Sequence, residues 1–159
     1  MMKLTKKADY GLIALKHLAM YGHQGSASAK DIADCYGIPQ ALLAKILQKL
    51  ARHGFLRSHH GTHGGYLLAR DPAAITALEV IRLIDGPVLL TSCETPRGAC
   101  GHSERCNVRE PLRRVHDSIL HLLNSITIRE LTREEPEPAE GGCAPCPPTE
   151  AGRPALHVL

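Results

Sequence analysis

Apolar residues recur every three or four positions near the start of the chain, and this spacing predicts two helices there. The first helix begins with Thr5 as its N-cap, and a glycine-rich segment ends it. Its apolar face is made of Tyr10, Ile13, Ala14, His17, Leu18 and Tyr21. A short second helix runs over residues 29–36, with Ser28 and Asp31 spaced as a capping box and Gly37 as its stop.

A third helix follows after a Gly-Ile-Pro turn. Pro39 suits its first turn, and the helix runs to about His53, where Gly54 ends it. Its buried stripe is formed by Leu42, Leu43, Ile46, Leu47 and Leu50. Because the turn has the length of a helix-turn-helix connection, the second and third helices are expected to form that motif.

Two short apolar segments around a glycine-rich tip come next and predict a β-hairpin. The segments are F-L-R-S-H-H at residues 55–60 and Y-L-L-A-R at residues 66–70, and G-T-H-G-G lies between them. A hairpin directly after a helix-turn-helix is a wing. A further helix is expected over residues 73–85, with Thr76 and Glu79 as another capping box.

A long helix is predicted after Cys106. Asn107 and Glu110 are spaced as a cap pair, Pro111 fits the first turn, and the helix reaches residue 133. Apolar residues at alternating spacings of three and four form a seam made of Leu112, Val115, Ile119, Leu122 and Ile126. Such a seam favours a homodimer, although docking onto the chain's own core would need the same pattern.

These elements predict a mainly α fold with a small β-hairpin wing, in which a winged helix-turn-helix is joined to a long dimerisation helix. We expect a DNA-binding domain at residues 1–86, a cysteine-rich loop at 87–109, a dimerisation helix at 110–133 and a tail at 134–159. The tail is rich in Pro, Gly and Glu and has almost no apolar content, so we expect it to be disordered.

The charge is divided unevenly along the chain. Residues 1–70 contain ten Lys and Arg against three Asp and Glu, a net charge of +7, whereas residues 71–159 have a net charge of −4. This split is typical of a chain whose first half faces a polyanion. It favours double-stranded DNA as a partner, although an ordinary solvated surface would give similar counts.

Candidate DNA contacts lie on the polar face of the third helix and on the wing. Gln can form paired hydrogen bonds with adenine, and Lys can reach guanine or phosphate. The candidates are Gln40, Ala44, Lys45, Gln48, Lys49, Arg57, His60 and His63. Any solvated helix could have the same Lys and Gln residues, and the wing histidines could instead bind a metal. Two copies of the chain would read a palindromic operator.

Three cysteines between the wing and the long helix are the main candidates for chemistry. Cys93, Cys100 and Cys106 are separated by six and five residues. Soft thiolates so close together suit an iron–sulfur cluster, a zinc ion or a thiol switch. The sequence shows neither a membrane span nor a signal peptide, so we expect a cytoplasmic protein. In that compartment metal or redox ligands are more common than structural disulfides.

The other cysteines have weaker signals. Cys35 is expected to be a buried thiol on the second helix. Cys143 and Cys146 form C-A-P-C in the tail, a spacing that could bind a metal or form a disulfide. The sequence lacks a nucleophile elbow, a phosphate loop and an H-E-x-x-H pair, so we expect no enzyme. A thiol oxidoreductase or scaffold that uses C-A-P-C is the alternative from another class.

Several motifs together resemble the Rrf-type (IscR/NsrR-like) family of winged-helix iron–sulfur transcriptional regulators. They are K-L-T-K-K-A-D-Y-G, D-I-A-D-C-Y-G-I-P, L-L-A-K-I-L-Q-K-L, G-T-H-G-G-Y-L-L-A-R, E-V-I-R-L-I-D-G-P and L-L-N-S-I-T-I-R-E-L. The resemblance covers about residues 2–133 and is strongest to regulators of the SUF iron–sulfur assembly operon. It implies a homodimer in which Cys93, Cys100 and Cys106 hold a cluster that controls operator binding.

The resemblance also bears on the fourth ligand. The IscR branch uses a His three residues after the last cysteine, where this chain has Arg109, which cannot ligate a metal. The NsrR branch uses an Asp of the partner chain, and Asp9 stands at the matching position. This pattern favours a 4Fe–4S over a 2Fe–2S cluster. His102 and His116 are rival ligands, and Asp9 could instead serve only to stabilise the start of its helix.

Overall fold

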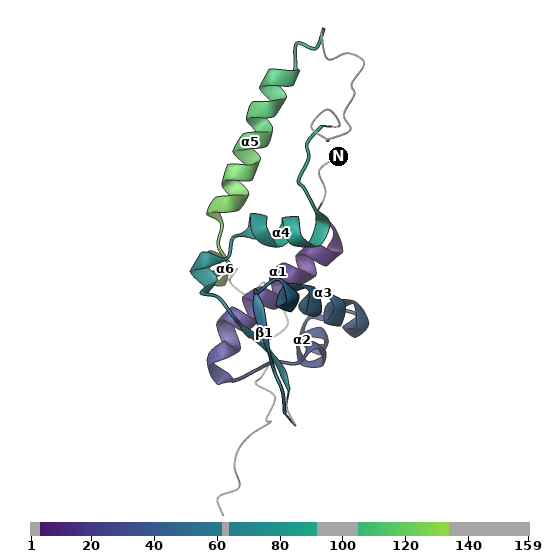
Figure 1. The fold of residues 1–159 in the computed structure, drawn as a ribbon, viewed down its shortest axis with the longest axis vertical. Coiled ribbons are helices and arrows are strands. Elements are labelled where there is room, and N and C mark those ends of the chain that lie inside the picture. The colour runs from purple at the N-terminus through teal and green to yellow at the C-terminus, as the bar shows by residue number, and fades with distance from the viewer. Residues whose placement is uncertain (1–3, 62–63, 92–104, 134–159) are drawn as a thin grey trace, which may run out of the picture.

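The computed structural model describes residues 4–61, 64–91 and 105–133, and it has the predicted mainly helical architecture with a two-stranded wing (Figure 1). Two single turns of 3₁₀ helix, Gly22–Gln24 and Pro72–Ala74, accompany the longer elements. In chain order these elements are α1 (Lys6–Tyr21), α2 (Ala29–Tyr36), α3 (Gln40–Arg52), β1 (Leu56–His59), β2 (Gly65–Leu68), α4 (Ala77–Asp85), α5 (Arg109–Ser125) and α6 (Ile128–Arg133).

The ends of the first helices follow the local sequence. The Thr5 hydroxyl accepts a hydrogen bond from the backbone N–H of Ala8 at 3.4 Å, which confirms Thr5 as the N-cap of α1. Ser28 and Asp31 form the predicted capping box of α2. Gly37 ends α2 with φ of 63°, a left-handed conformation that glycine adopts without steric cost. These caps set the turn between α2 and α3.

One aliphatic core joins α1, α3 and α4 with the short α6. Its largest fully buried side chains are Leu15, Ile32, Leu43, Leu47, Leu50, Ile75, Val80, Ile81 and Ile128. Burying each of these side chains contributes about 1.5–3 kcal/mol. The predicted stripe of α3 is buried apart from Leu42, which packs partly exposed against the core. The core therefore fixes α3 with its polar face outward.

The wing pairs β1 with β2 in antiparallel register, from Leu56 opposite Leu68 to His59 opposite Gly65. Ala27, just before α2, adds a bridge on the other side of β2. The Tyr66 N–H donates to the Ala27 carbonyl at 2.8 Å, and the Ala27 N–H donates to the Tyr66 carbonyl at 3.2 Å. The hairpin is thereby tied to the start of the helix-turn-helix.

The helix expected over residues 73–85 begins later than the sequence suggested. Thr76 has extended backbone angles and forms the capping box with Glu79, so α4 starts at Ala77. Residues 72–74 form a 3₁₀ turn instead, whose Ala73 N–H is capped by the Asp71 carboxylate at 2.8 Å. The capping box was predicted correctly, but it also fixes where the helix must start.

The long helix expected over residues 110–133 is two helices, and this prediction was wrong. α5 ends at Ser125, and the carbonyl of Ile126 accepts a hydrogen bond from the Ala77 N–H at 2.8 Å. Ile126 therefore leaves the predicted seam. Thr127 starts α6 with a reciprocal pair of hydrogen bonds to Glu130, which is a capping box that the sequence contains.

The predicted cap of the long helix also differs. α5 starts at Arg109, with Val108 as an N-cap that makes no side-chain hydrogen bond, so Asn107 is not the cap residue. The Glu110 carboxylate instead pairs with the Arg113 guanidinium at 2.9 Å. Pro111 lies in the first turn, as expected. The tail at 134–159 lies outside the described residues. Within the described residues, no helix is both long enough and apolar enough to cross a membrane.

Candidate nucleic-acid interface and cysteine segment

The polar face of α3 is open to solvent next to the wing. Lys45 and Gln48 are exposed, and Ala41 and Arg52 lie on the same side at spacings of four residues. Arg52 was absent from the predicted contacts, although its place seven residues after Lys45 could have revealed it. This stripe has the cationic and amide groups that contact phosphates and base edges.

The remaining predicted contacts on α3 are placed less uniformly. Gln40 is exposed at the start of the helix, whereas Ala44 is half-buried. Lys49 is exposed, and its ammonium group donates a hydrogen bond to the carbonyl of Ile84 in the last turn of α4 at 3.4 Å. This bond gives Lys49 a role within the fold, and its contact with DNA stays a prediction.

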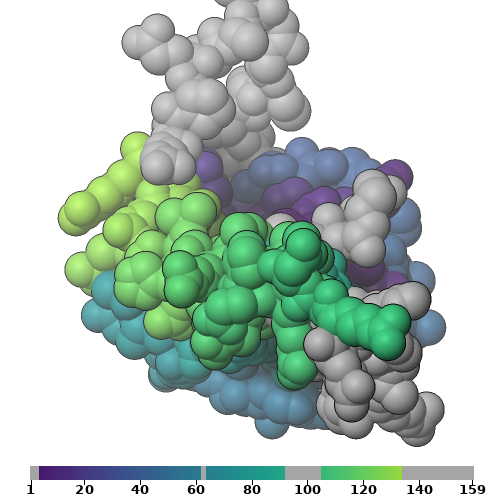
Figure 2. Space-filling model, turned by 90° about the horizontal axis from the view of Figure 1, so that it is seen from above, coloured from purple at the N-terminus to yellow at the C-terminus, as the bar shows by residue number. Residues whose placement is uncertain are grey.

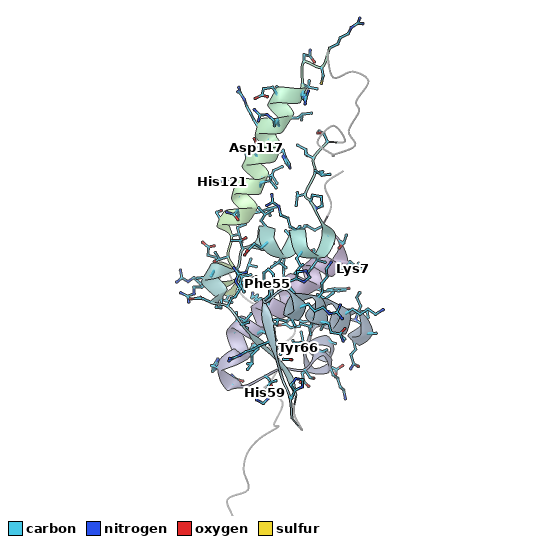
Figure 3. All side chains as sticks on the ribbon, viewed as in Figure 1. Lys7, Phe55, His59, Tyr66, Asp117 and His121 are labelled. Carbon is cyan, nitrogen blue, oxygen red and sulfur yellow. The ribbon has the colours of Figure 1, made fainter. Side chains whose placement is uncertain are left out.

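The wing has its polar side chains toward its tip. Arg57 and His60 are exposed, and His59 lies near the lower end of the hairpin in Figure 3. His63 lies outside the described residues. In residues 4–61, 64–91 and 105–133, no three metal-ligating side chains lie together. Arg57 and His60 therefore remain candidate DNA contacts on the wing.

Ion pairs hold the base of the wing. The Arg70 guanidinium lies 5.2 Å from the centre of the Phe55 ring, donates to the carbonyl of Ala74 at 2.6 Å and pairs with Glu79 of α4 at 3.5 Å. One residue further on, the carboxylate of Asp71 pairs with Arg129 of α6 at 3.0 Å. The hairpin is therefore anchored to both α4 and α6.

A buried histidine connects α1 with the end of α2. His17 is only 8% exposed, and its Nδ1 lies 3.2 Å from the hydroxyl of Tyr36. Its ring also contacts the ring of Tyr21. Burial lowers the pKa of His17, and the negative charge of Asp31 opposes that shift. Burial therefore favours the neutral form of this ring beside the helix-turn-helix.

The structure describes only part of the predicted metal site. Cys106 is half-buried three residues before α5, while Cys93 and Cys100 lie outside the described residues. Asp9 is exposed in the first turn of α1, and Arg109 is exposed at the first position of α5. Within one chain, the structure records no contact between Asp9 and Cys106.

His116, a rival ligand, is already engaged within the fold. Its Nε2 lies 2.9 Å from the carbonyl of Val88, and its Nδ1 lies 3.7 Å from the Asp117 carboxylate. A metal could reach Nε2 only after the hydrogen bond to Val88 was lost. The other rival, His102, lies outside the described residues.

α5 presents an apolar surface to solvent. In the described part of the chain this helix has no buried residue, and Figure 2 shows it on the outside of the body. The exposed apolar residues are Val108, Leu112, Val115 and Leu122. A shallow groove runs along this side and is lined by Arg114, Val115, Ser118, Ile119 and Leu122.

A helix-turn-helix followed by a hairpin wing is a winged-helix fold, a class that includes many transcriptional regulators. The chain belongs to the Rrf2 family, described as iron-dependent transcriptional regulators, whose pattern matches residues 4–134. This membership confirms the resemblance drawn from the sequence motifs. Members with assigned roles are transcriptional regulators and not enzymes, in agreement with the lack of catalytic motifs.

Individual relatives agree with this assignment. The HTH-type transcriptional regulator IscR of Xenorhabdus nematophila is 32% identical over 134 residues, which are 84% of this chain and 81% of that protein. CymR, the global cysteine regulator of B. subtilis, has a TM-score of 0.70 and 30% identity, covering 86% of this chain and all of that one. T. potens IscR has a TM-score of 0.67 and 27% identity, and the match covers 84% of this chain and 88% of that one.

Proposed function

We propose that this chain is an iron–sulfur-dependent repressor whose cluster state controls its affinity for operator DNA. The observation that supports the proposal best is the position of the cysteine segment. It joins the end of α4, which contacts α1 and α3, to the start of α5, whose apolar side chains are exposed in the part of the chain that the structure describes. A change in this segment therefore acts on the DNA-reading body and on the dimer helix together.

The donor set suits an iron–sulfur cluster and would also suit zinc, and the description of the family as iron-dependent favours the cluster. Cys93, Cys100 and Cys106 would provide three thiolates, and Asp9 from the partner chain would provide the fourth ligand. Arg109 is excluded by its chemistry, and Nε2 of His116 is held by the carbonyl of Val88. A carboxylate ligand exchanges more easily than a thiolate, which suits a sensor, and we favour 4Fe–4S over 2Fe–2S. When bound, the cluster would supply the redox or nitrosative chemistry that is sensed.

The exposed apolar face of α5 supports a homodimer. Val115 is 49% exposed and Leu122 is 59% exposed, which is uncommon for aliphatic residues repeated along one helix. A second copy of α5 would bury this stripe and bring two α3 helices to successive major grooves of a palindromic operator. We expect the regulated genes to serve iron–sulfur assembly or the response to nitrosative or oxidative stress.

The test is an anaerobic purification with two matched cysteine variants. We expect the wild-type protein to be brown, with visible absorption and bound iron and sulfide, and Cys100→Ala to be colourless. Cys35→Ala changes a half-buried thiol on α2 and is expected to keep the colour. Operator duplexes selected in vitro from random sequences should bind the loaded and cluster-free forms with different affinities. A colourless wild-type protein with stoichiometric zinc would contradict the proposal.

The likeness to CymR favours a second candidate, a regulator that senses thiols or zinc without a cluster. In that case the cysteine segment would form disulfides on oxidation, and operator affinity would respond to dithiothreitol but not to iron. An affinity that follows iron and sulfide content, and stays constant in dithiothreitol once the cluster is absent, would exclude this candidate.

A further inference from the structure

The last turn of α4 lies where three elements meet. We call Ile84 and Asp85, the last two residues of α4, the α4 junction. The Asp85 carboxylate accepts hydrogen bonds from the backbone N–H of Thr5, at 3.0 Å, and from the Thr5 hydroxyl. The carbonyl of Ile84 accepts a hydrogen bond from the ammonium group of Lys49 on α3. The junction therefore contacts the start of the first helix and the DNA-reading helix.

Close packing supports these polar contacts. Ile84 lies against Gly11 of α1, where an added Cβ atom would stand 2.3 Å from the Ile84 Cδ1 atom. The end of the Ile84 side chain therefore fills the space beside Gly11, and α1 and α4 approach each other closely here. Because protein interiors are close-packed, a displacement of the α4 junction would press on α1.

The chain leaving the junction is held again three residues later. Gly86 turns the chain with φ of 90°, and the Val88 carbonyl then accepts a hydrogen bond from Nε2 of His116 on α5 at 2.9 Å. Only four residues separate Val88 from Cys93. The segment from Asp85 to Val88 thus links the α1–α4 contact to the dimer helix just before the cysteines begin.

The choice of residue at position 85 suggests more than a local role. A carboxylate at the C-terminal end of α4 faces the negative end of that helix's dipole, which is an unfavourable place for it. The same carboxylate lies at the N-terminal end of α1, where the dipole favours a negative charge. Asp85 is therefore suited to joining α4 to α1 and not to ending α4.

We propose that Asp85 is a positioning residue that passes the state of the cysteine segment to α1 and α3. This inference rests on the proposed function. When the segment beyond Val88 changes, the short link to Asp85 moves, one of the two hydrogen bonds from Thr5 is lost, and the junction shifts against Lys49. The recognition helix then changes its position relative to the other copy.

The test compares Asp85→Asn with Asp71→Asn. Asn at position 85 can keep one hydrogen bond from Thr5 but loses the charge. Asp71→Asn makes the same chemical change at another carboxylate with two partners, Ala73 and Arg129, away from the junction. Operator Kd is measured for the loaded and cluster-free forms of each protein, with iron content and Tm as checks. Thr5→Ser, which keeps a hydroxyl, should behave like the wild-type protein.

We expect Asp85→Asn to load iron normally while the ratio of the two Kd values falls at least about fivefold toward one. Asp71→Asn should keep the wild-type ratio. If Asp85→Asn keeps the ratio, or if both variants lose it equally, the inference is overturned and the proposed function stands. If the wild-type protein has equal Kd values in both forms, the proposed function fails and takes the inference with it.

Discussion

Gly65 determines how closely the wing approaches the body. An added Cβ atom there would lie 2.5 Å from the backbone oxygen of Ala27 and 2.9 Å from the N atom of Ser28. These are backbone atoms held by the bridge between Ala27 and Tyr66, so they cannot move aside without breaking it. The glycine is thus required by space and not by its backbone angles.

We expect Gly65→Ala to lower the free energy of unfolding by about 1–3 kcal/mol, the usual cost of overpacking. Gly22→Ala is the matched control, because a Cβ atom at Gly22 meets nothing within 4 Å and its φ is −59°. Urea denaturation of both variants measures the difference. Equal stability of the two would show that the wing can move away from Ala27.

The buried ring of His17 makes stability depend on pH. Because burial lowers its pKa in the folded state, the unfolded chain takes up the proton first as the pH falls. The free energy of unfolding is therefore highest above the ordinary pKa of 6.5, where His17 is neutral in both states. It decreases as the pH falls from 6.5 toward the lowered pKa of the folded state.

Urea denaturation at several pH values from 5 to 8 tests this dependence. We expect the free energy of unfolding of the wild-type protein to fall below pH 6.5 and that of His17→Leu to fall less steeply. Tyr36→Phe removes the hydroxyl beside the ring but leaves the ring buried, so it should keep the wild-type dependence. Parallel curves for wild type and His17→Leu would refute the role of this residue.

At the scale of elements, the sequence predicted what local chemistry decides and missed what tertiary contacts decide. The caps at Thr5, Ser28 and Gly37 were read correctly because each depends on neighbours within a few residues. The end of the long helix at residue 125 was not predicted, because backbone hydrogen bonds between residues 126–128 and residues 75–77 break the helix there. The capping box at Thr127 was the local signal that could have shown it.

The exposed stripe of α5 gives a prediction for the whole helix. Val115→Asp places a charge in the expected dimer contact twice, once in each copy. Losing two buried Val side chains alone weakens association by about 3 kcal/mol, or roughly a hundredfold in Kd. Sedimentation equilibrium measures the change. His121→Asp adds the same charge six residues later, about 120° around α5 from Val115, and should leave the dimer intact.

A monomeric wild-type protein, or equal dissociation in both variants, would contradict this use of α5. Because Val115 is exposed in the single chain, the substitution should leave helix content unchanged, and circular dichroism checks that point. The dimer contact can thus be separated from the stability of the helix itself.

At the scale of the whole molecule, the basic first half should make DNA binding depend on salt. Each lysine that neutralises a phosphate contributes about 0.9 to the slope of log K against log salt concentration. We expect Lys45→Ala to reduce the slope by about this amount. Lys49→Ala should reduce the slope less, because its ammonium group also donates a hydrogen bond to the carbonyl of Ile84. Equal reductions in both variants would contradict this difference between the two lysines.

The candidate site could be predicted only in part, because the sequence shows local spacing but not contacts between distant residues. Spacing along the chain was enough to single out Cys106 and its two neighbours, since they lie close in sequence. Spacing could not show that His116 is hydrogen-bonded to the carbonyl of Val88, 28 residues away. Nor could it show that Asp85 accepts hydrogen bonds from Thr5, 80 residues away. Such contacts exist only once the core has formed.

The attachment of α5 has a mechanical consequence. The helix rises over α4 and is fastened at its lower end, where Ile126 and Ile128 bond to the backbone of residues 75–77 (Figure 1). Its 17 residues make a lever about 25 Å long. If the end of α5 beside Cys106 moves by about 2 Å, the helix rotates by only about 5° about its fastened end. A weak pull at the tip therefore exerts a large torque on the backbone hydrogen bonds of Ile126 and Ile128.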